Sequence, residues 1–110
     1  MRMNDYQAAA ARTINSALYP EQQLHHALHG MAGEVGEIHS IFQKAFQGHP
    51  IDKEHLKKEF GDLLWMVTEG CTANGWTLED VAHDNIVKLQ ARYPEGFSTE
   101  RSLHRKEGGV

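Results

Sequence analysis

The sequence has 110 residues, of which 40% are hydrophobic and 24% are charged. A chain of this length forms one domain with a modest core, and this composition is typical of a globular protein rather than a disordered one. The formal net charge of −4 and the pI near 6.0 argue against a protein that binds nucleic acid, because there is no basic stripe to neutralise phosphates.

The cysteine count and the lack of long apolar runs indicate a cytoplasmic protein. Cys71 is the only cysteine, which excludes an internal disulfide and fits a reducing compartment. The first residues contain no apolar segment of the kind found in signal peptides. No apolar run approaches the length that crosses a bilayer, so we expect no membrane association.

Four segments carry apolar residues at helical spacing, and no strand pattern is present. Caps and breakers predict where the helices begin and end. The first begins at an Asn4 cap and ends at Tyr19, the second runs from Pro20 to about Gln47, the third lies between an Asp52 cap and Asn74–Gly75, and the fourth lies between Thr77 and Arg92. We therefore predict an all-α fold, a bundle of four to five helices over residues 1–97, followed by a polar tail over 98–110 whose tip, EGGV, is poorly ordered.

Three of these helices carry long apolar stripes. The stripe of the second helix has a heptad-like spacing for packing against other helices, and that of the fourth is expected to be buried. The members are Leu24, Leu28, Met31, Val35, Ile38, Phe42 and Ala45 in the second helix, Leu56, Phe60, Leu63, Leu64, Val67 and Cys71 in the third, and Leu78, Val81, Ala82, Ile86 and Leu89 in the fourth.

Acidic residues occur as two pairs with the same spacing: Glu34 and Glu37 in GEVGE, and Glu59 and Asp62 in EFGD. In a helix this i, i+3 spacing places both carboxylates on one side, where they repel each other. A hard divalent ion such as Mg²⁺ would relieve the repulsion, and Mg²⁺ characteristically combines a few carboxylates with waters and substrate phosphates. Either pair alone would be read as ordinary exposed acids, but two pairs beside apolar stripes favour a metal site.

Gly30, Gly33 and Gly36 lie on the same side of the second helix as its two acids. Each interior glycine costs about 1 kcal/mol relative to alanine, so three of them need a compensating reason. Either another backbone packs closely there or a ligand does.

Asn85, Lys88 and Arg92 share a side of the fourth helix, beside its apolar stripe. If this side faces the acids, the two basic residues hold phosphate oxygens that the metal does not cover, and the site binds a polyphosphate bridged by Mg²⁺. The alternative is a polar border with one core asparagine.

The remaining reactive side chains favour no competing site. His25 and His29 are spaced to chelate a transition metal, but no HExxH motif or cysteine pair completes a zinc site. Cys71 lies on an apolar face and is interpreted as a small core residue. Trp65 and Trp76 are candidates to stack on a base, and Trp65 alternatively serves a subunit contact.

These motifs resemble the MazG-like, all-α nucleoside triphosphate pyrophosphohydrolases, whose relatives include all-α dUTPases and dCTP pyrophosphatases. GEVGE and EFGD are similar to the ExxE…ExxD signature of that family. The resemblance covers most of residues 6–97 and includes YQ…ART, HGMAGEVGEI, FGDLLWMV and NIVKLQARYPEGF. GMAGEVG stands in place of the commoner LGLAGEAGE, so that His29 occupies a position where leucine is frequent.

The resemblance implies cleavage of the α–β phosphoanhydride of a nucleoside triphosphate, giving a nucleoside monophosphate and pyrophosphate, with Mg²⁺ as cofactor and Mn²⁺ as a substitute. It makes Glu34, Glu37, Glu59 and Asp62 the metal ligands, one of which also orients or deprotonates the attacking water. The resemblance also favours purine deoxynucleotides as substrates.

The resemblance also implies which side chains contact the substrate. Asn85 meets the sugar or a phosphate, Lys88 and Arg92 meet the phosphate chain together with Lys44, and Tyr93 lines the nucleotide pocket. Family members assemble as homodimers or homotetramers with the site near a subunit boundary, which agrees with the stripe on the second helix. The alternatives are a dUTP- or dCTP-type pyrimidine nucleotide pyrophosphatase and a non-catalytic helical module whose acids bind a metal or a basic partner.

Overall fold

In the computed structural model, which describes residues 1–104, the chain is all-α and no strand is formed within that range. The five helices are α1 (Met3–Ala11), α2 (Pro20–Ala45), α3 (Lys53–Ala73), α4 (Leu78–Arg92) and α5 (Thr99–Leu103). This confirms the predicted fold class. The short α5 lies in the segment expected to be a polar tail, and the EGGV tip lies outside the described residues.

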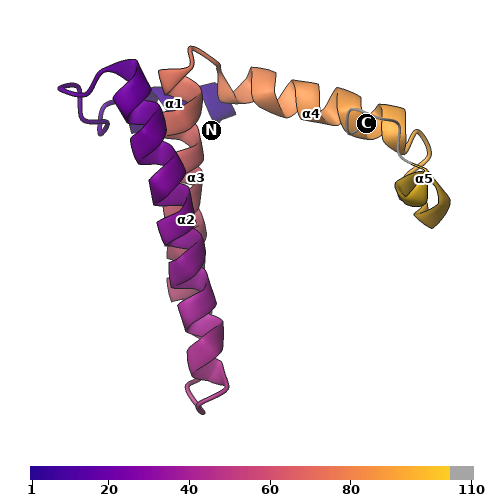
Figure 1. Cartoon of the computed structure of the whole chain (residues 1–110), viewed down its shortest axis with the longest axis horizontal. Coiled ribbons are helices and arrows are strands. Elements are labelled where there is room, and N and C mark those ends of the chain that lie inside the picture. The colour runs from indigo at the N-terminus through magenta and orange to yellow at the C-terminus, as the bar shows by residue number, and fades with distance from the viewer. Residues whose placement is uncertain (105–110) are drawn as a thin grey trace.

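The two long helices α2 and α3 form an antiparallel hairpin, and α4 extends away from one end of it as an arm (Figure 1). The radius of gyration is 17.1 Å. A compact chain of this length would have a value of about 13 Å. One copy of the chain is therefore open in shape, with its helices only partly covered by one another.

Local signals place most helix ends where the sequence predicts them. The Asp52 carboxylate accepts hydrogen bonds from the backbone of Glu54 and His55 at the start of α3. Thr77 caps α4 in the same way through the backbone N–H of Asp80. Gly75 ends α3 with a φ of +75°, a conformation that favours glycine.

The first helix is shorter than predicted. α1 begins after Arg2 rather than at an Asn4 cap, and it ends at Ala11 rather than at Tyr19. The Thr13 hydroxyl donates to the carbonyl of Ala10, and the Asn15 side chain accepts from a backbone N–H two residues on. Such local side-chain bonds compete with helix continuation, which explains why the helix stops early.

Residues of α1 fix the start of α4. The Gln7 side chain donates to the Thr72 hydroxyl and the Trp76 carbonyl, and it accepts from the backbone N–H of Leu78. The Asn4 side chain donates to the carboxylate of Glu79. Polar contacts at its first turn therefore hold α4 to the rest of the fold.

The face of α2 that packs on α3 combines small residues with part of the predicted apolar stripe, of which Leu24, Met31, Ile38 and Ala45 are half-buried. Ala27 is fully buried, and Gly30 lies directly beneath the Met66 side chain of α3. Three members of the stripe, Leu28, Val35 and Phe42, are exposed. No atom lies within 4 Å of a Cβ added at Gly33 or Gly36, so close packing explains only the first of the three glycines.

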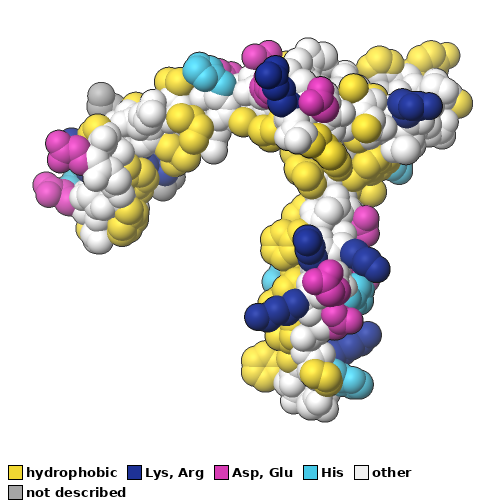
Figure 2. All heavy atoms as spheres, turned by 180° about the vertical axis from the view of Figure 1, so that it is seen from behind, with side chains coloured by type: hydrophobic (Ala, Val, Ile, Leu, Met, Phe, Trp, Pro, Cys, Tyr) yellow, Lys and Arg dark blue, Asp and Glu magenta, His cyan; other side chains and the backbone are white. Residues whose placement is uncertain are grey.

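The expectation of a buried stripe on α4 is wrong for a single chain. Leu78 is buried at the start of the helix, but Val81, Ile86 and Leu89 are exposed. The reason is geometric, because α4 contacts α1 and the end of α3 and then leaves the hairpin. Figure 2 shows hydrophobic side chains along both the hairpin and the arm.

Gly30 and Gly33 form a matched pair for testing this packing. A Cβ at position 30 would lie 2.2 Å from the Met66 sulfur, so Gly30→Ala forces the flexible end of that side chain to move and is expected to reduce the free energy of unfolding by up to about 1 kcal/mol. Gly33→Ala adds a methyl group to open space and should raise it by up to about 1 kcal/mol. Urea denaturation of both variants measures the difference, and equal effects would contradict the packing described here.

Candidate metal centre

The hairpin brings three of the four predicted acids together. Carboxylate oxygens of Glu34, Glu59 and Asp62 all lie within 4.8 Å of one another. Glu34 comes from α2 and the other two come from α3, so the antiparallel pairing of the helices creates the group. Of the residues that the structure describes, these three form the candidate metal-binding cluster of acidic, histidine or cysteine side chains.

Glu34 is the most constrained member of the cluster. Its burial, a hydrogen bond with Glu59 and the negative charges of Asp62, Glu59 and Glu37 raise the pKa of its carboxyl group above the ordinary value. Its Oε2 atom is buried and has no hydrogen-bond partner among the described residues. A buried oxygen of this kind is costly unless something binds it, and a divalent cation fits a donor set made only of carboxylate oxygens.

Glu37, the fourth predicted acid, is exposed and lies outside this compact group. Its charge nevertheless contributes to the raised pKa of Glu34, so it lies near enough to act on the site electrostatically. It remains a predicted ligand that the geometry of one chain does not bring into the cluster.

Sequence reasoning missed a histidine beside the cluster. The Nε2 atom of His55 lies 3.1 Å from Oε1 of Glu59, one turn further along α3. This contact orients a carboxylate that faces the candidate metal position, as second partners of metal ligands commonly do. The i, i+4 spacing of the two residues was the available signal.

The predicted phosphate contacts on α4 are not near the acids within one chain. Asn85 and Lys88 are exposed on α4, which extends away from the hairpin (Figure 1). Arg92 and Tyr93 lie at the far end of that helix, where the guanidinium carbon is 5.8 Å from the centre of the Tyr93 ring. Lys44 is exposed in the last turn of α2.

Among the other candidate side chains, Cys71, His25 and His29 are ordinary core or surface residues, whereas Trp65 contacts the loop after α1. Cys71 is buried and burial raises the pKa of its thiol, which fits an inert core residue. The rings of His25 and His29 lie 6.5 Å apart. Trp65 lies near the loop after α1 and donates its indole N–H to Thr13 over 2.7 Å. Among the described helices none is long and apolar enough to cross a membrane.

The chain is thus a small all-α protein in which two helices bring three carboxylates together at a candidate divalent-cation site. Residues 22–97 match the model of the MazG nucleotide pyrophosphohydrolase domain. The chain therefore belongs to the MazG family, which supports a nucleotide pyrophosphohydrolase activity.

The Gene 37 protein of Mycobacterium phage L5 is 29% identical over 108 residues, which cover 87% of this chain and 92% of that protein. No solved structure matches the chain.

The raised pKa of Glu34 predicts how the metal-free protein responds to pH. The folded state binds the Glu34 proton more tightly than the unfolded state does, so this residue lowers stability at neutral pH. That loss is recovered as the pH falls through the raised pKa towards the ordinary value. Thermal unfolding in EDTA should show that Glu34→Gln is more stable than wild type at pH 7 and that the difference vanishes near pH 4.

Proposed function

We propose that the protein hydrolyses nucleoside triphosphates between the α- and β-phosphates, using Mg²⁺ and releasing a nucleoside monophosphate and pyrophosphate. The observation that carries this proposal is the meeting of Glu34, Glu59 and Asp62 at the hairpin, with carboxylate oxygens within 4.8 Å. Membership of the MazG family supplies the class of reaction. Mn²⁺ is an expected substitute, and the location is cytoplasmic.

The acids have two tasks in this proposal. Glu34, Glu59 and Asp62 hold the cation, with Glu37 joining them when substrate is bound. When bound, Mg²⁺ neutralises charge on the phosphates and lowers the pKa of a water ligand. One carboxylate of the set orients the attacking water and accepts its proton.

A second copy of the chain supplies the rest of the site. The hairpin leaves Leu28, Val35, Phe42 and Phe60 exposed, and the arm does the same with Ile86. Leu28, Val35 and Phe42 are seven residues apart and so share one face of α2, and an exposed apolar face of this kind favours a contact with another protein. If the arm of a second copy covers the hairpin, the apolar faces of the arm and of the hairpin would both be buried. The polar side of the arm would then face the acids.

This arrangement assigns the predicted substrate contacts to the arm of the second copy. Asn85, Lys88, Arg92 and Tyr93 would reach the sugar and phosphates from that arm, while Lys44 acts from the hairpin. We expect a homodimer or a homotetramer, in which every site is bounded by two chains. Purine deoxynucleotides are the favoured substrates.

A substrate panel tests the reaction. Wild-type protein with Mg²⁺ and each deoxynucleoside triphosphate should release pyrophosphate and the monophosphate, and Asp62→Asn should lower kcat/KM by at least about 100-fold while keeping the helical fold. Orthophosphate as the phosphate product would contradict the proposed bond cleavage. Turnover of dUTP or dCTP alone would identify a pyrimidine enzyme, and no turnover of any nucleotide would favour the interaction module.

Mixing two inactive variants tests the shared site. In a dimer whose sites combine the acids of one chain with Lys88 of the other, a mixed dimer of Asp62→Asn and Lys88→Ala contains one intact site. After unfolding and joint refolding, random pairing should restore about a quarter of the wild-type rate. If each chain uses its own Lys88, both sites of the mixed dimer stay defective and the rate does not recover.

A further inference from the structure

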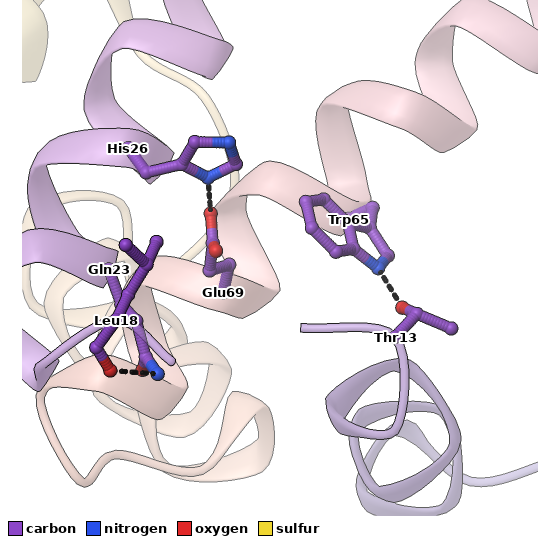
Figure 3. A network of polar contacts seen from close by, with 6 residues as sticks. All are labelled: Thr13, Leu18, Gln23, His26, Trp65 and Glu69. Carbon is purple, nitrogen blue, oxygen red and sulfur yellow. Dashed lines mark hydrogen bonds and ion pairs between the residues drawn. The ribbon is translucent and has the colours of Figure 1, made fainter. Parts of the chain in front are cut away.

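A buried carboxylate and a histidine form a second polar cluster on the same hairpin, away from the candidate metal centre. Glu69 is 1% exposed, and its Oε1 atom lies 2.6 Å from Nδ1 of His26 (Figure 3). Its Oε2 atom is buried and has no hydrogen-bond partner among the described residues. A buried ion pair or polar pair of this kind adds little to stability compared with apolar residues of similar size, so its presence points to a role other than holding the fold together.

The pair fixes the orientation of a half-exposed imidazole. The His26 side chain is 50% exposed, whereas its partner is inaccessible to solvent. A carboxylate bound to Nδ1 sets the tautomer and ring position, and it leaves Nε2 as the nitrogen available to a ligand. His26 is therefore a pre-oriented hydrogen-bonding group on the surface of the hairpin.

An aromatic ring lies beside this imidazole. The Trp65 and His26 rings are 6.4 Å apart at an angle of 88°. The indole N–H of Trp65 is held by the Thr13 hydroxyl, and the Gln23 side chain donates to the carbonyl of Leu18 (Figure 3). The loop between α1 and α2 thus contacts the Trp65 ring through Thr13 and the first turns of α2 through Leu18.

The distance between the acids and the cluster of His26, Trp65 and Glu69 is similar to the length of a nucleoside. Glu69 follows Asp62 by seven residues, which places it on nearly the same face of α3 and about 10 Å further along the axis. Trp65 lies between them on that helix, and Gly30 and Met66 meet at the corresponding level of the hairpin. A nucleotide whose phosphates are bound at the acids would extend its base towards this cluster.

We propose that Trp65 and His26 form the nucleobase subsite, with the indole contacting the face of the base and Nε2 of His26 hydrogen-bonding its edge. Glu69 is a positioning residue that acts through His26. This inference rests on the proposed function, because it places the phosphates of the same substrate at the acids. The ligand is the base of a nucleoside triphosphate, and His26 is a determinant of base preference.

The test compares His26→Ala with wild type on the four deoxynucleoside triphosphates and on abasic deoxyribose triphosphate. Loss of a base contact should raise KM for the preferred nucleotides at least about tenfold and leave kcat nearly unchanged. The differences in kcat/KM among the four bases should become smaller, and the kinetics of the abasic substrate should not change. His25→Ala is the matched control, because this neighbouring histidine pairs with His29 rather than Glu69, and it should change nothing. An equal effect on the abasic substrate, or no effect in an active enzyme, would overturn the subsite.

Two variants of Glu69 separate positioning from packing. Glu69→Gln still accepts a hydrogen bond from His26 and should keep most of the base preference. Glu69→Leu removes that bond and should lose the preference without a lower unfolding temperature. If Glu69→Leu keeps the wild-type preference, Glu69 has no positioning role.

Binding tests the subsite without turnover. In a Trp76→Phe background Trp65 is the remaining tryptophan, so its fluorescence reports on ligands near the cluster. Deoxynucleoside monophosphates should quench it and pyrophosphate should not. Absence of quenching by any monophosphate would refute the subsite, whereas failure of the proposed function would appear separately as a lack of pyrophosphate release by wild type.

Discussion

The close contact between α2 and α3 is the constraint on which the rest of the structure depends. Fully buried Ala27, with Gly30 beneath Met66 and Gly70 in contact with Met31, lets the two helix axes approach along one seam. That register places Glu34 opposite Glu59 and Asp62, and it places His26 opposite Glu69. A larger side chain at the seam would separate both sets of partners, because the two clusters share the same packed interface.

The polar groups along this seam work against stability in the isolated chain. Three carboxylates lie within 4.8 Å of one another, and the pKa of Glu34 is raised by its burial, by a hydrogen bond with Glu59 and by the neighbouring negative charges. Glu69 adds a second buried acid with one oxygen that has no partner among the described residues. Costs of this kind cluster at functional sites, so both ends of the seam are candidate ligand sites.

Local signals in the sequence predicted most of the fold. The caps at Asp52 and Thr77 and the stop at Gly75 depend only on neighbouring residues, so the ends of α3 and the start of α4 were predictable. The equal spacing of the two acid pairs indicated a shared site. The pairing of His26 with Glu69 joins residues 43 positions apart, and no local pattern marks it. The early end of α1 was missed because its helical periodicity continues into a loop held by Thr13.

The direction of α4 was beyond prediction from one sequence for a different reason. Its apolar stripe was expected to be buried, but most of it is exposed because α4 contacts the rest of the chain only near its start. The radius of gyration of 17.1 Å reflects this open shape. Because α4 extends away from the hairpin, the basic residues of the arm lie far from the acids within one chain. Covering the hairpin with the arm of a second copy would bury apolar surface and enclose the carboxylates in the same step. Assembly and completion of the site would then be one event, since the side chains expected to bind phosphate lie on the helix that needs a partner to bury its stripe.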